Sequence, residues 1–429
     1  MLHKLLFKLG QAKRNPSLQS HYNFLLESDI WSKEQIEAYQ LTKLKELLVH
    51  AYNYSPFYTR LFNQLSFDPN NIQSIDDLNK LPLMDKRIAI DNNKEIQSRY
   101  DFKKLFVAET SGTSGATLKI FRSEEWDSYN RAALFRGYHW YGVNPWDKNG
   151  YFWGFNISPK KRFITRVLDK LQNRFRIFSY SENEVRKFVE QLKKGATFIG
   201  GYSSMIYETA KMVNKLGIGD DINLKMIKGT SEKIYDSYQE EVKKAFGKKI
   251  ISEYGSCETG IIAYECPECG NMHIVSEHVI VECIDGEIVV TNLLSHSFPI
   301  IRYKLGDSVE LEDPKFECSC GRKHPVIKSV LGRVGKKIIG KTASYPSLTF
   351  YYVFKNMGLT KNINLNYQAQ QTEAGKVVLL IEQDTPEYLP DLNEEIIKYF
   401  GNDIDFTVMW GQKIRPEKGK LRDFITTIN

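Results

Sequence analysis

The segment Thr110-Ser111-Gly112-Thr113-Ser114-Gly115-Ala116-Thr117-Leu118-Lys119 decides how the rest of the chain is interpreted. Its first six residues carry four hydroxyl groups and two glycines, so backbone amides and hydroxyls can all turn toward one anion. A Walker-type P-loop does not fit, because Gly112 and Gly115 are only three positions apart and no Gly-Lys pair follows. The segment alone leaves two interpretations open, a surface turn of small polar residues or a cradle for a triphosphate.

Composition favours a multidomain globular protein. At 429 residues the chain is long enough for roughly two or three domains, and 42% hydrophobic residues, with 24 Tyr and 24 Phe, are enough to build sizeable cores. Lys and Arg number 59 against 52 Asp and Glu. This mild basic excess forms no stripe with interleaved aromatic residues, so we expect no nucleic-acid partner.

The first ten residues, Met1 to Gly10, place lysines inside an apolar run and offer no small-residue cleavage site. This pattern is not typical of a signal peptide, and no apolar run approaches the ~18 residues that span a bilayer. We therefore expect a cytoplasmic protein. The segment is interpreted as an amphipathic helix docked on the protein's own body, with peripheral contact to an anionic membrane as the alternative. The oligomeric state is not fixed, and a dimer is one option.

From 124 to 260, helical stretches alternate with short apolar strands, a pattern typical of βαβ units in a mostly parallel sheet. The predicted strands are 151–154, 198–201, 225–227 and 250–252. Another short strand, 105–108, delivers the opening segment, as expected where open α/β sheets bind ligands. The pattern then changes between 278 and 312 to antiparallel strands, with Asp285-Gly286 as a hairpin turn.

After residue 332 the pattern starts again, with strands 363–368, 377–382 and 404–410 and a helix at 391–400. We predict an α/β fold in which a large N-terminal domain (1–331) combines mixed βαβ sheets with a small antiparallel subdomain. The N-terminal domain begins with a helical segment, about 1–100, and its antiparallel region covers about 262–325. A small, mobile α+β domain (332–429) follows, of a size usual for one domain.

Four of the six cysteines form two close pairs, Cys266-Pro267-Glu268-Cys269 and Cys318-Ser319-Cys320, separated by 48 residues. Two thiolate pairs brought together make a four-sulfur tetrahedral site, which suits structural Zn²⁺. A redox pair or plain buried thiols are the alternatives. His273 is close enough in sequence to replace one cysteine.

Three further segments carry side chains suited to a nucleotide. Glu258, after the turn at Tyr254-Gly255, can hold Mg²⁺ against phosphate oxygens, or is a solvated turn residue. The Tyr254 ring can lie against a flat base or belong to the core. Asp307 follows an apolar strand and can accept hydrogen bonds from ribose hydroxyls, or is a plain turn carboxylate. Lys420 lies on a glycine-containing turn, and is otherwise one surface lysine among many.

The order of these motifs, with Gly332-Arg333 at the domain boundary, resembles the adenylate-forming superfamily of acyl- and aryl-CoA ligases. The resemblance spans about 110–420. The cysteine pairs, the segment Met272-His273-Ile274-Val275-Ser276-Glu277-His278 and the opening at 31–58 are similar to the phenylacetate-CoA ligase branch, which includes capsular-polysaccharide-biosynthesis proteins.

The resemblance implies a site for ATP and AMP. The nucleotide-binding residues that it implies are Thr110, Ser111, Gly112, Thr113, Ser114, Gly115, Ser231, Glu232, Tyr254, Gly255, Asp307 and Arg333. Glu258 would hold Mg²⁺, and Lys420 would bridge the substrate carboxylate and the α-phosphate. Loop amides, a divalent ion and a mobile lysine would neutralise the charge that develops when a carboxylate attacks a phosphate.

The chain departs from the family pattern at three positions. The hinge residue two after Arg333, commonly Asp or Lys, is Gly335, which still permits rotation. Thr117 replaces a proline near the end of the phosphate loop, so that its lysine is displaced to Lys119. Lys233 replaces the proline that usually follows Ser231-Glu232.

The implied function is ATP- and Mg-dependent activation of a carboxylic acid as an acyl-adenylate, with release of pyrophosphate and acyl transfer to CoA. Direct transfer to a sugar amine or hydroxyl in polysaccharide biosynthesis is one alternative. A non-catalytic nucleotide-binding scaffold in polysaccharide assembly is the other. Because a scaffold needs no mobile lysine, the presence of Lys420 in the same chain as Glu258, Asp307 and Arg333 favours an enzyme.

Overall fold

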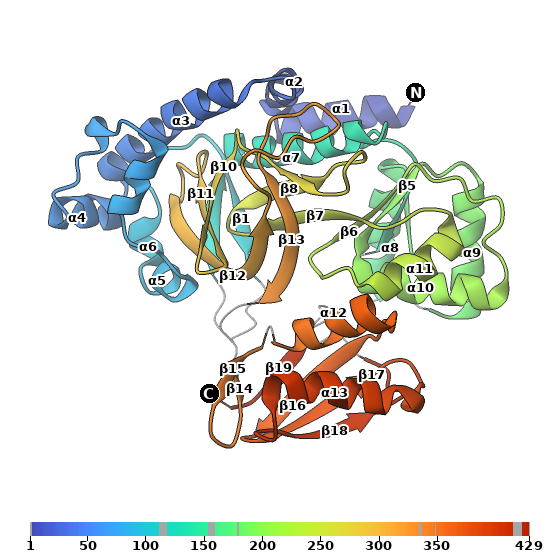
Figure 1. Ribbon diagram of the computed structural model, residues 1–429. Helices are drawn as coiled ribbons and strands as arrows, with labels where there is room; N and C mark the ends of the chain where they lie inside the picture. Colours follow the sequence, from blue (N-terminus) through green and yellow to red (C-terminus); the bar gives the residue numbers. More distant parts are fainter. Residues whose placement is uncertain are drawn as a thin grey trace.

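The computed structural model describes the chain except for residues 1, 111–117, 153–158, 178–179, 334–336, 348, 415–422 and 429. An 11-stranded sheet forms its centre (Figure 1), in the order β10-β11-β12-β13-β9-β8-β7-β6-β5-β3-β4. Its strands are β3 (Asn149–Phe152), β4 (Arg174–Arg176), β5 (Phe198–Tyr202), β6 (Met226–Thr230), β7 (Ile251–Ser256), β8 (Gly260–Glu265), β9 (Met272–Ile274), β10 (Val279–Ile284), β11 (Glu287–Asn292), β12 (Ile300–Leu311) and β13 (Val326–Arg333).

The half of this sheet from β7 to β4 is parallel, so the predicted βαβ pattern is confirmed. Strands β3, β5 and β6 are mostly buried, and the helices between the parallel strands close a core that includes Phe152, Ile199, Ile206 and Ile227. The helices from this part of the chain are α7 (Glu124–Trp140), α8 (Pro159–Leu171), α9 (Glu182–Lys193), α10 (Ser203–Leu216) and α11 (Asp236–Phe246).

The other half of the sheet is antiparallel, as predicted. Strands β10 and β11 form the expected hairpin, and both turn residues adopt the left-handed conformation, with φ of 51° at Asp285 and 76° at Gly286. Positive φ at both central residues is typical of a two-residue hairpin turn.

The N-terminal helices lie at the top and left of Figure 1; most of them pack against this antiparallel half, whereas the first runs along α7 and reaches the end of α8. They are α1 (Leu2–Arg14), α2 (Leu18–Ser28), α3 (Lys33–Tyr54), α4 (Pro56–Gln64), α5 (Lys86–Asp91) and α6 (Asn93–Ile96), with short 3₁₀ turns at Pro69–Asn71 and Ile75–Lys80. Ser32 caps α3 through a capping box with Gln35, which is the start signal in the sequence. Helix α1 contacts the body through Phe7, whose ring lies 5.6 Å from that of Phe135.

The strand that precedes the segment Thr110 to Lys119 belongs to a different sheet from the one predicted. β1 (Leu105–Glu109) pairs antiparallel with β2 (Lys119–Ser123) in a separate two-stranded sheet. The expectation of a strand in an open α/β sheet was therefore wrong. A short apolar strand before a glycine-rich loop looks the same in a hairpin and in a βα unit, and only the pairing partner distinguishes them.

The C-terminal domain lies below the large sheet in Figure 1 and has its own four-stranded sheet, in the order β18-β17-β16-β19. Its elements are β14 (Lys337–Ile339), β15 (Ser344–Pro346), α12 (Thr349–Lys361), β16 (Tyr367–Glu373), β17 (Lys376–Ile381), a 3₁₀ turn at Pro386–Tyr388, α13 (Leu389–Phe400), β18 (Asp405–Met409) and β19 (Phe424–Thr426). The predicted α+β composition is confirmed, although α12 was missed because its start, Thr349-Phe350-Tyr351-Tyr352-Val353, favours a strand.

The large sheet ends at Arg333 in β13, and the C-terminal sheet begins at Tyr367 in β16. The predicted boundary at 332 falls at the end of the last strand of the large sheet. Among the described helices, none combines the length and the apolar character that crossing a membrane requires.

Candidate functional site

Two of the residues predicted to bind the nucleotide are in contact, although they are 53 residues apart in sequence. The hydroxyl of Tyr254 in β7 donates a hydrogen bond of 2.9 Å to the carboxylate of Asp307 in β12. These strands are separated by β8, β9 and β13 in the sheet, so the sheet curls strongly between them. The backbone of Asp307 pairs with that of Arg333 at the end of β13. We call Tyr254, Asp307, Glu258 and Tyr303 the nucleotide edge.

Glu258 lies in the turn between β7 and β8 and is only 8% exposed. The Tyr303 hydroxyl donates to its carboxylate at 3.4 Å, a long bond that leaves most of the carboxylate's acceptor capacity for another group. Gly255 is required for this turn, since a Cβ there would lie 2.3 Å from the carbonyl oxygen of Gly260. A buried carboxylate with one weak donor is a suitable ligand for a divalent cation.

Ser231 and Glu232 follow β6 and shape the adjoining turn. Ser231 adopts a left-handed backbone, with φ of 67°, and the Glu232 carboxylate accepts the backbone N–H of Ser204 at 2.9 Å. Ser204 lies in the first turn of α10, where unpaired N–H groups attract negative charge. Glu232 is therefore held in place at the carboxyl ends of the parallel strands.

The sequence-based interpretation missed a buried ion pair next to these residues. Lys228 in β6 is 7% exposed and pairs with Glu253 in β7, and Thr230 donates a 3.0 Å hydrogen bond to the same carboxylate. Burial lowers the pKa of Lys228, but the Glu253 carboxylate outweighs it and the net shift is upward. The available signal was a lysine inside the apolar strand Met226-Ile227-Lys228.

Several predicted site residues fall outside the described part of the chain: Ser111, Gly112, Thr113, Ser114, Gly115, Gly335 and Lys420. Thr110, which is described, is buried and closes the base of the loop, because its hydroxyl accepts the backbone N–H of Leu118 at 3.0 Å. For Arg333 the structure describes the backbone, which pairs with that of Asp307, but not the side chain. The structure therefore brings Tyr254, Asp307 and the Arg333 backbone together.

Polar contacts connect the two domains beside this site. The Tyr235 hydroxyl donates to the Asp423 carboxylate, and the Lys233 ammonium lies 3.9 Å from the centre of the Tyr351 ring. Farther along α10, Lys211 forms an ion pair with Glu382. Lys233, which was noted only as a departure from the family pattern, thus belongs to the domain interface.

The second cluster gathers three of the four predicted cysteines around His273. One ligand atom from each of Cys266, Cys269, Cys318 and His273 lies within 4.8 Å of all the others, and the sulfurs of Cys266 and Cys318 are 3.7 Å apart. Two sulfurs bound to one tetrahedral Zn²⁺ at about 2.3 Å would lie about 3.8 Å apart. We call these four residues and Cys320 the cysteine cluster.

Two side chains compete for the fourth position in the cysteine cluster. The sulfur of Cys320 lies 3.2 Å from Nε2 of His273, so both groups stand beside the three other cysteines. Nδ1 of His273 lies 3.2 Å from the carbonyl oxygen of His324. Donation of an N–H there leaves Nε2 as the nitrogen that carries a lone pair, and burial lowers the pKa of His273 to about 4. A neutral imidazole is the form that binds a metal.

No family model matches the chain. Two proteins of known name are similar to most of it. Protein CapK of Staphylococcus aureus is 24% identical over 87% of this chain and 86% of that protein. Phenylacetate-coenzyme A ligase of Thermus thermophilus is 22% identical over 92% of this chain and 97% of that protein.

Among solved structures, a 2-hydroxyisobutyryl-CoA ligase with its acyl-AMP in the postadenylation state has the same fold. It matches with a TM-score of 0.71 and 15% identity over 93% of this chain and 91% of that one. The TM-score to the same ligase in its thioesterification state is 0.61 at the same coverage. The fold of the solved structure and the similarity to the two proteins over most of their length support the adenylate-forming superfamily, in its phenylacetate-CoA ligase-like branch, as the family that this chain resembles.

Proposed function

We propose that this protein activates a carboxylic acid with ATP, releases pyrophosphate and transfers the acyl group from the acyl-adenylate to CoA. The observation that carries the proposal is the contact between Tyr254 and Asp307, which joins the two motifs expected at adenine and ribose. The similarity to phenylacetate-coenzyme A ligase over nearly the whole length supports the same activity.

In the first half-reaction, a carboxylate oxygen of the acid attacks the α-phosphorus, and the bond to the bridging oxygen of pyrophosphate breaks. Asp307 would accept hydrogen bonds from the ribose hydroxyls. Its bond from Tyr254 would keep the carboxylate directed toward the ribose, and the tyrosine ring would lie beside the base. In the second half-reaction the CoA thiolate attacks the acyl carbon, and AMP leaves with the electron pair of the carbon–oxygen bond.

Glu258 is the residue that we assign to Mg²⁺, because it is a buried carboxylate at the same edge of the sheet. The ion, when bound, supplies positive charge to the phosphate oxygens and so reduces their repulsion of the incoming carboxylate. Lys420 is assigned the positive charge between the substrate carboxylate and the α-phosphate. Its position on the C-terminal domain allows the domain to remove it before the thiol attacks.

The test is pyrophosphate release over a panel of carboxylic acids, with and without CoA, for the parent protein and Lys420→Ala. We expect release that depends on the acid, and a loss of at least about a hundredfold in Lys420→Ala, the usual scale for removing a charge that stabilises a transition state. ATP binding should stay nearly unchanged. Lys413→Ala removes an exposed lysine just before the same segment and is the matched control.

Equal rates for Lys420→Ala and Lys413→Ala would remove Lys420 from the mechanism. If no acid supports release although the folded protein binds ATP, the scaffold alternative is favoured. Product that forms from a sugar but not from CoA would favour the sugar acceptor. Those alternatives, a role in polysaccharide biosynthesis and a dimeric state remain predictions from the sequence.

The cysteine cluster is proposed to hold a structural Zn²⁺. The support is the 3.7 Å separation of two sulfurs and the neutral His273, whose Nδ1 faces a carbonyl oxygen. Cys266, Cys269 and Cys318 would bind the ion together with either His273 or Cys320. Metal analysis of the purified protein is the test: about one equivalent of zinc is expected.

A further inference from the structure

Helix α8 has its apolar side turned away from the protein. Apolar residues stand at the spacing i, i+1, i+4, i+5 and i+8, which forms one continuous stripe on a helix: Phe163, Ile164, Val167, Leu168 and Leu171. All five are about half exposed or more, and Phe163 reaches 71%. Helices of a globular protein normally bury such a stripe against the core, so the orientation of α8 needs another explanation.

An ion pair on the opposite side of α8 fixes this orientation. Asp169 is 4% exposed, and its two carboxylate oxygens accept bonds of 2.8 Å each from the guanidinium of Arg176 in β4. A bidentate pair of this kind is strong and directional. The side chain that anchors α8 to the body is thus a carboxylate, and the apolar stripe is left for a partner.

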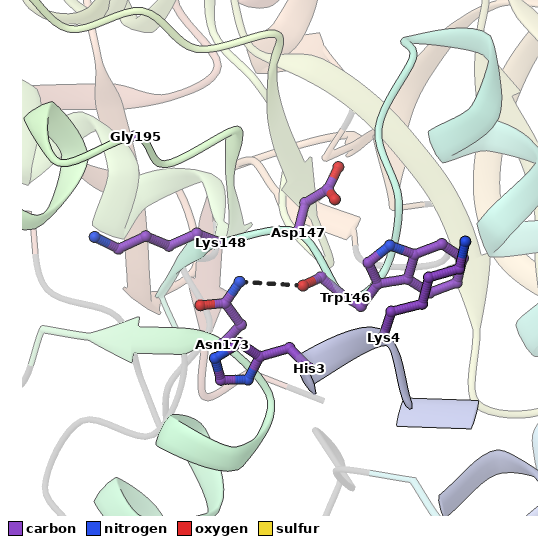
Figure 2. Close-up of a pocket in the computed structure, with 7 residues that line it drawn as sticks. All are labelled: His3, Lys4, Trp146, Asp147, Lys148, Asn173 and Gly195. Carbon is purple, nitrogen blue, oxygen red and sulfur yellow. Dashed lines mark hydrogen bonds between the residues drawn. The ribbon is translucent and has the colours of Figure 1, made fainter. Parts of the chain in front are cut away.

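Helix α1 adds a second apolar row next to the first. Leu2, Leu5 and Leu9 share one face at i, i+3 and i+7, and each is more than half exposed. The His3 ring lies 3.3 Å from the carbonyl oxygen of Leu171 at the end of α8. Figure 2 shows a pocket at the start of α1, where Lys4 lies beside Trp146 and His3 lies beside Asn173.

Trp146 holds both helices in place. On one side its ring contacts Phe7 of α1, with centroids 5.7 Å apart. On the other, its carbonyl oxygen accepts a 3.2 Å bond from Asn173, two residues after α8, as the dashed line in Figure 2 shows. We call the exposed side of α1 and α8 the basic–apolar face.

The charges on these two helices indicate which partner fits. Together they contain nine Lys and Arg residues and one acidic residue, the buried Asp169. The whole chain has a net charge of only +7, so all the rest of the sequence is close to neutral. Exposed leucines, isoleucine and phenylalanine interleaved with lysine and arginine are typical of helices that lie in the interface of an anionic membrane.

We propose that the basic–apolar face docks this protein on the surface of a bilayer that contains anionic phospholipids. Apolar side chains of α1 and α8 enter the boundary between headgroups and acyl chains, and the lysines and arginines contact lipid phosphates. A second copy of the chain is a poorer partner, because a twofold interface through this face would bring two strongly positive surfaces together.

Sedimentation with vesicles tests the proposal. The full-length protein should bind vesicles of phosphatidylcholine with about one third phosphatidylglycerol, bind pure phosphatidylcholine at least about tenfold less well, and dissociate as salt is raised. The double variant Ile164→Gln/Leu168→Gln should bind at least about tenfold less well. The double variant Lys8→Gln/Lys170→Gln should lose a similar factor.

Matched controls make the same chemical changes elsewhere. Ile397→Gln/Met409→Gln removes two exposed apolar residues from the C-terminal domain, and Lys215→Gln/Lys243→Gln removes two charges from α10 and α11; both should bind as the parent does. The thermal midpoint of every variant should match the parent's. Absence of binding to anionic vesicles at low salt, or equal loss in the controls, would overturn the proposal. So would a dimer that dissociates in Ile164→Gln/Leu168→Gln.

Discussion

The cysteine cluster and the nucleotide edge are both groups of polar side chains gathered from distant parts of the sequence, yet they differ in how they are built. In the cysteine cluster, ligand atoms from two loops and from His273 in β9 converge within 4.8 Å. At the nucleotide edge, the described contacts are one 2.9 Å bond and one 3.4 Å bond, and further motif residues lie outside the described part. The residues of the cysteine cluster all lie before the predicted boundary at 332, whereas the proposed reaction at the nucleotide edge also uses Lys420, which lies after it.

One strand links these two regions. β13 pairs with His273 at its first residue, Val326, and with Asp307 at its last, Arg333. Eight extended residues span about 25 Å, so the strand runs from the cysteine cluster to the domain boundary. From this difference we infer that the cysteine cluster fixes the scaffold, whereas the nucleotide edge is completed only during the reaction. Substitutions in the two should therefore have different consequences.

The largest effect is expected from removing a ligand of the cysteine cluster. Cys266→Ser should lose zinc and lower the free energy of unfolding by several kcal/mol, since metal binding at structural sites contributes directly to folding. Zinc content and thermal unfolding are the measurements. Cys283→Ser changes an exposed cysteine outside the cluster and should alter stability by less than about 0.5 kcal/mol. A Cys266→Ser protein with the parent's zinc content and midpoint would contradict the assignment.

The next largest effect is expected at the nucleotide edge and concerns binding, not folding. Asp307→Asn weakens two charge-assisted hydrogen bonds to ribose, each worth about 1.5–3 kcal/mol, so ATP should bind roughly a hundredfold less tightly. Calorimetric titration with ATP measures this change, and Asp313→Asn, in the loop after β12, is the control. A fall in thermal midpoint as large as that of Cys266→Ser, with ATP affinity unchanged, would show that Asp307 is structural and would erase the contrast between the two regions.

A smaller effect on ATP binding is expected from removing a single hydroxyl group at the nucleotide edge. Tyr254→Phe keeps the ring that would lie against the base and removes the hydroxyl that donates to Asp307. The hydroxyl donates to a carboxylate but does not itself contact ATP, so only part of the about 1.5–3 kcal/mol of such a bond should be lost from ATP binding, or roughly fivefold in the KM for ATP. Tyr52→Phe removes a comparable 3.0 Å bond to Asn63 far from the site. If Tyr52→Phe raises the KM as much, the effect of Tyr254→Phe is not specific.

The sequence predicted both regions because each contains a motif with its own chemistry. Cys-x-x-Cys indicates a metal site from a few residues. The order of motifs predicts one nucleotide site for Tyr254 and Asp307, and these two side chains are in contact. Periodicity also predicted the parallel strands and the β10–β11 hairpin. These features depend on local residues, and each can be recognised from a short segment.

The features that were missed depend on pairing at a distance. Nothing near residue 105 distinguishes a hairpin strand from a strand of the parallel sheet. The apolar residues of α8 have a clear helical period, but this period does not tell which side of the helix faces the body of the protein. That is decided by the bond between Asp169 and Arg176. Likewise the neighbours of Lys233 and Tyr235 in the sequence do not indicate a domain interface. Their partners, Tyr351 and Asp423, belong to a domain that begins about a hundred residues later.

The smallest effect is expected at the interface between the N-terminal and C-terminal domains, which lies beside the nucleotide edge and contains no residue of the cysteine cluster. Tyr235 donates to Asp423, three residues beyond Lys420, and the TM-score is 0.71 with the postadenylation state and 0.61 with the thioesterification state of the 2-hydroxyisobutyryl-CoA ligase. Tyr235→Phe should weaken this arrangement by about 0.5–1.5 kcal/mol and slow adenylation severalfold, while thioester formation from supplied acyl-adenylate stays equal or rises. Separate assays of the two half-reactions measure the ratio. Tyr388→Phe, on the C-terminal domain, is the control. Because Tyr235 lies in neither cluster, equal slowing of both half-reactions would mean that its bond to Asp423 supports the fold and does not favour one domain arrangement.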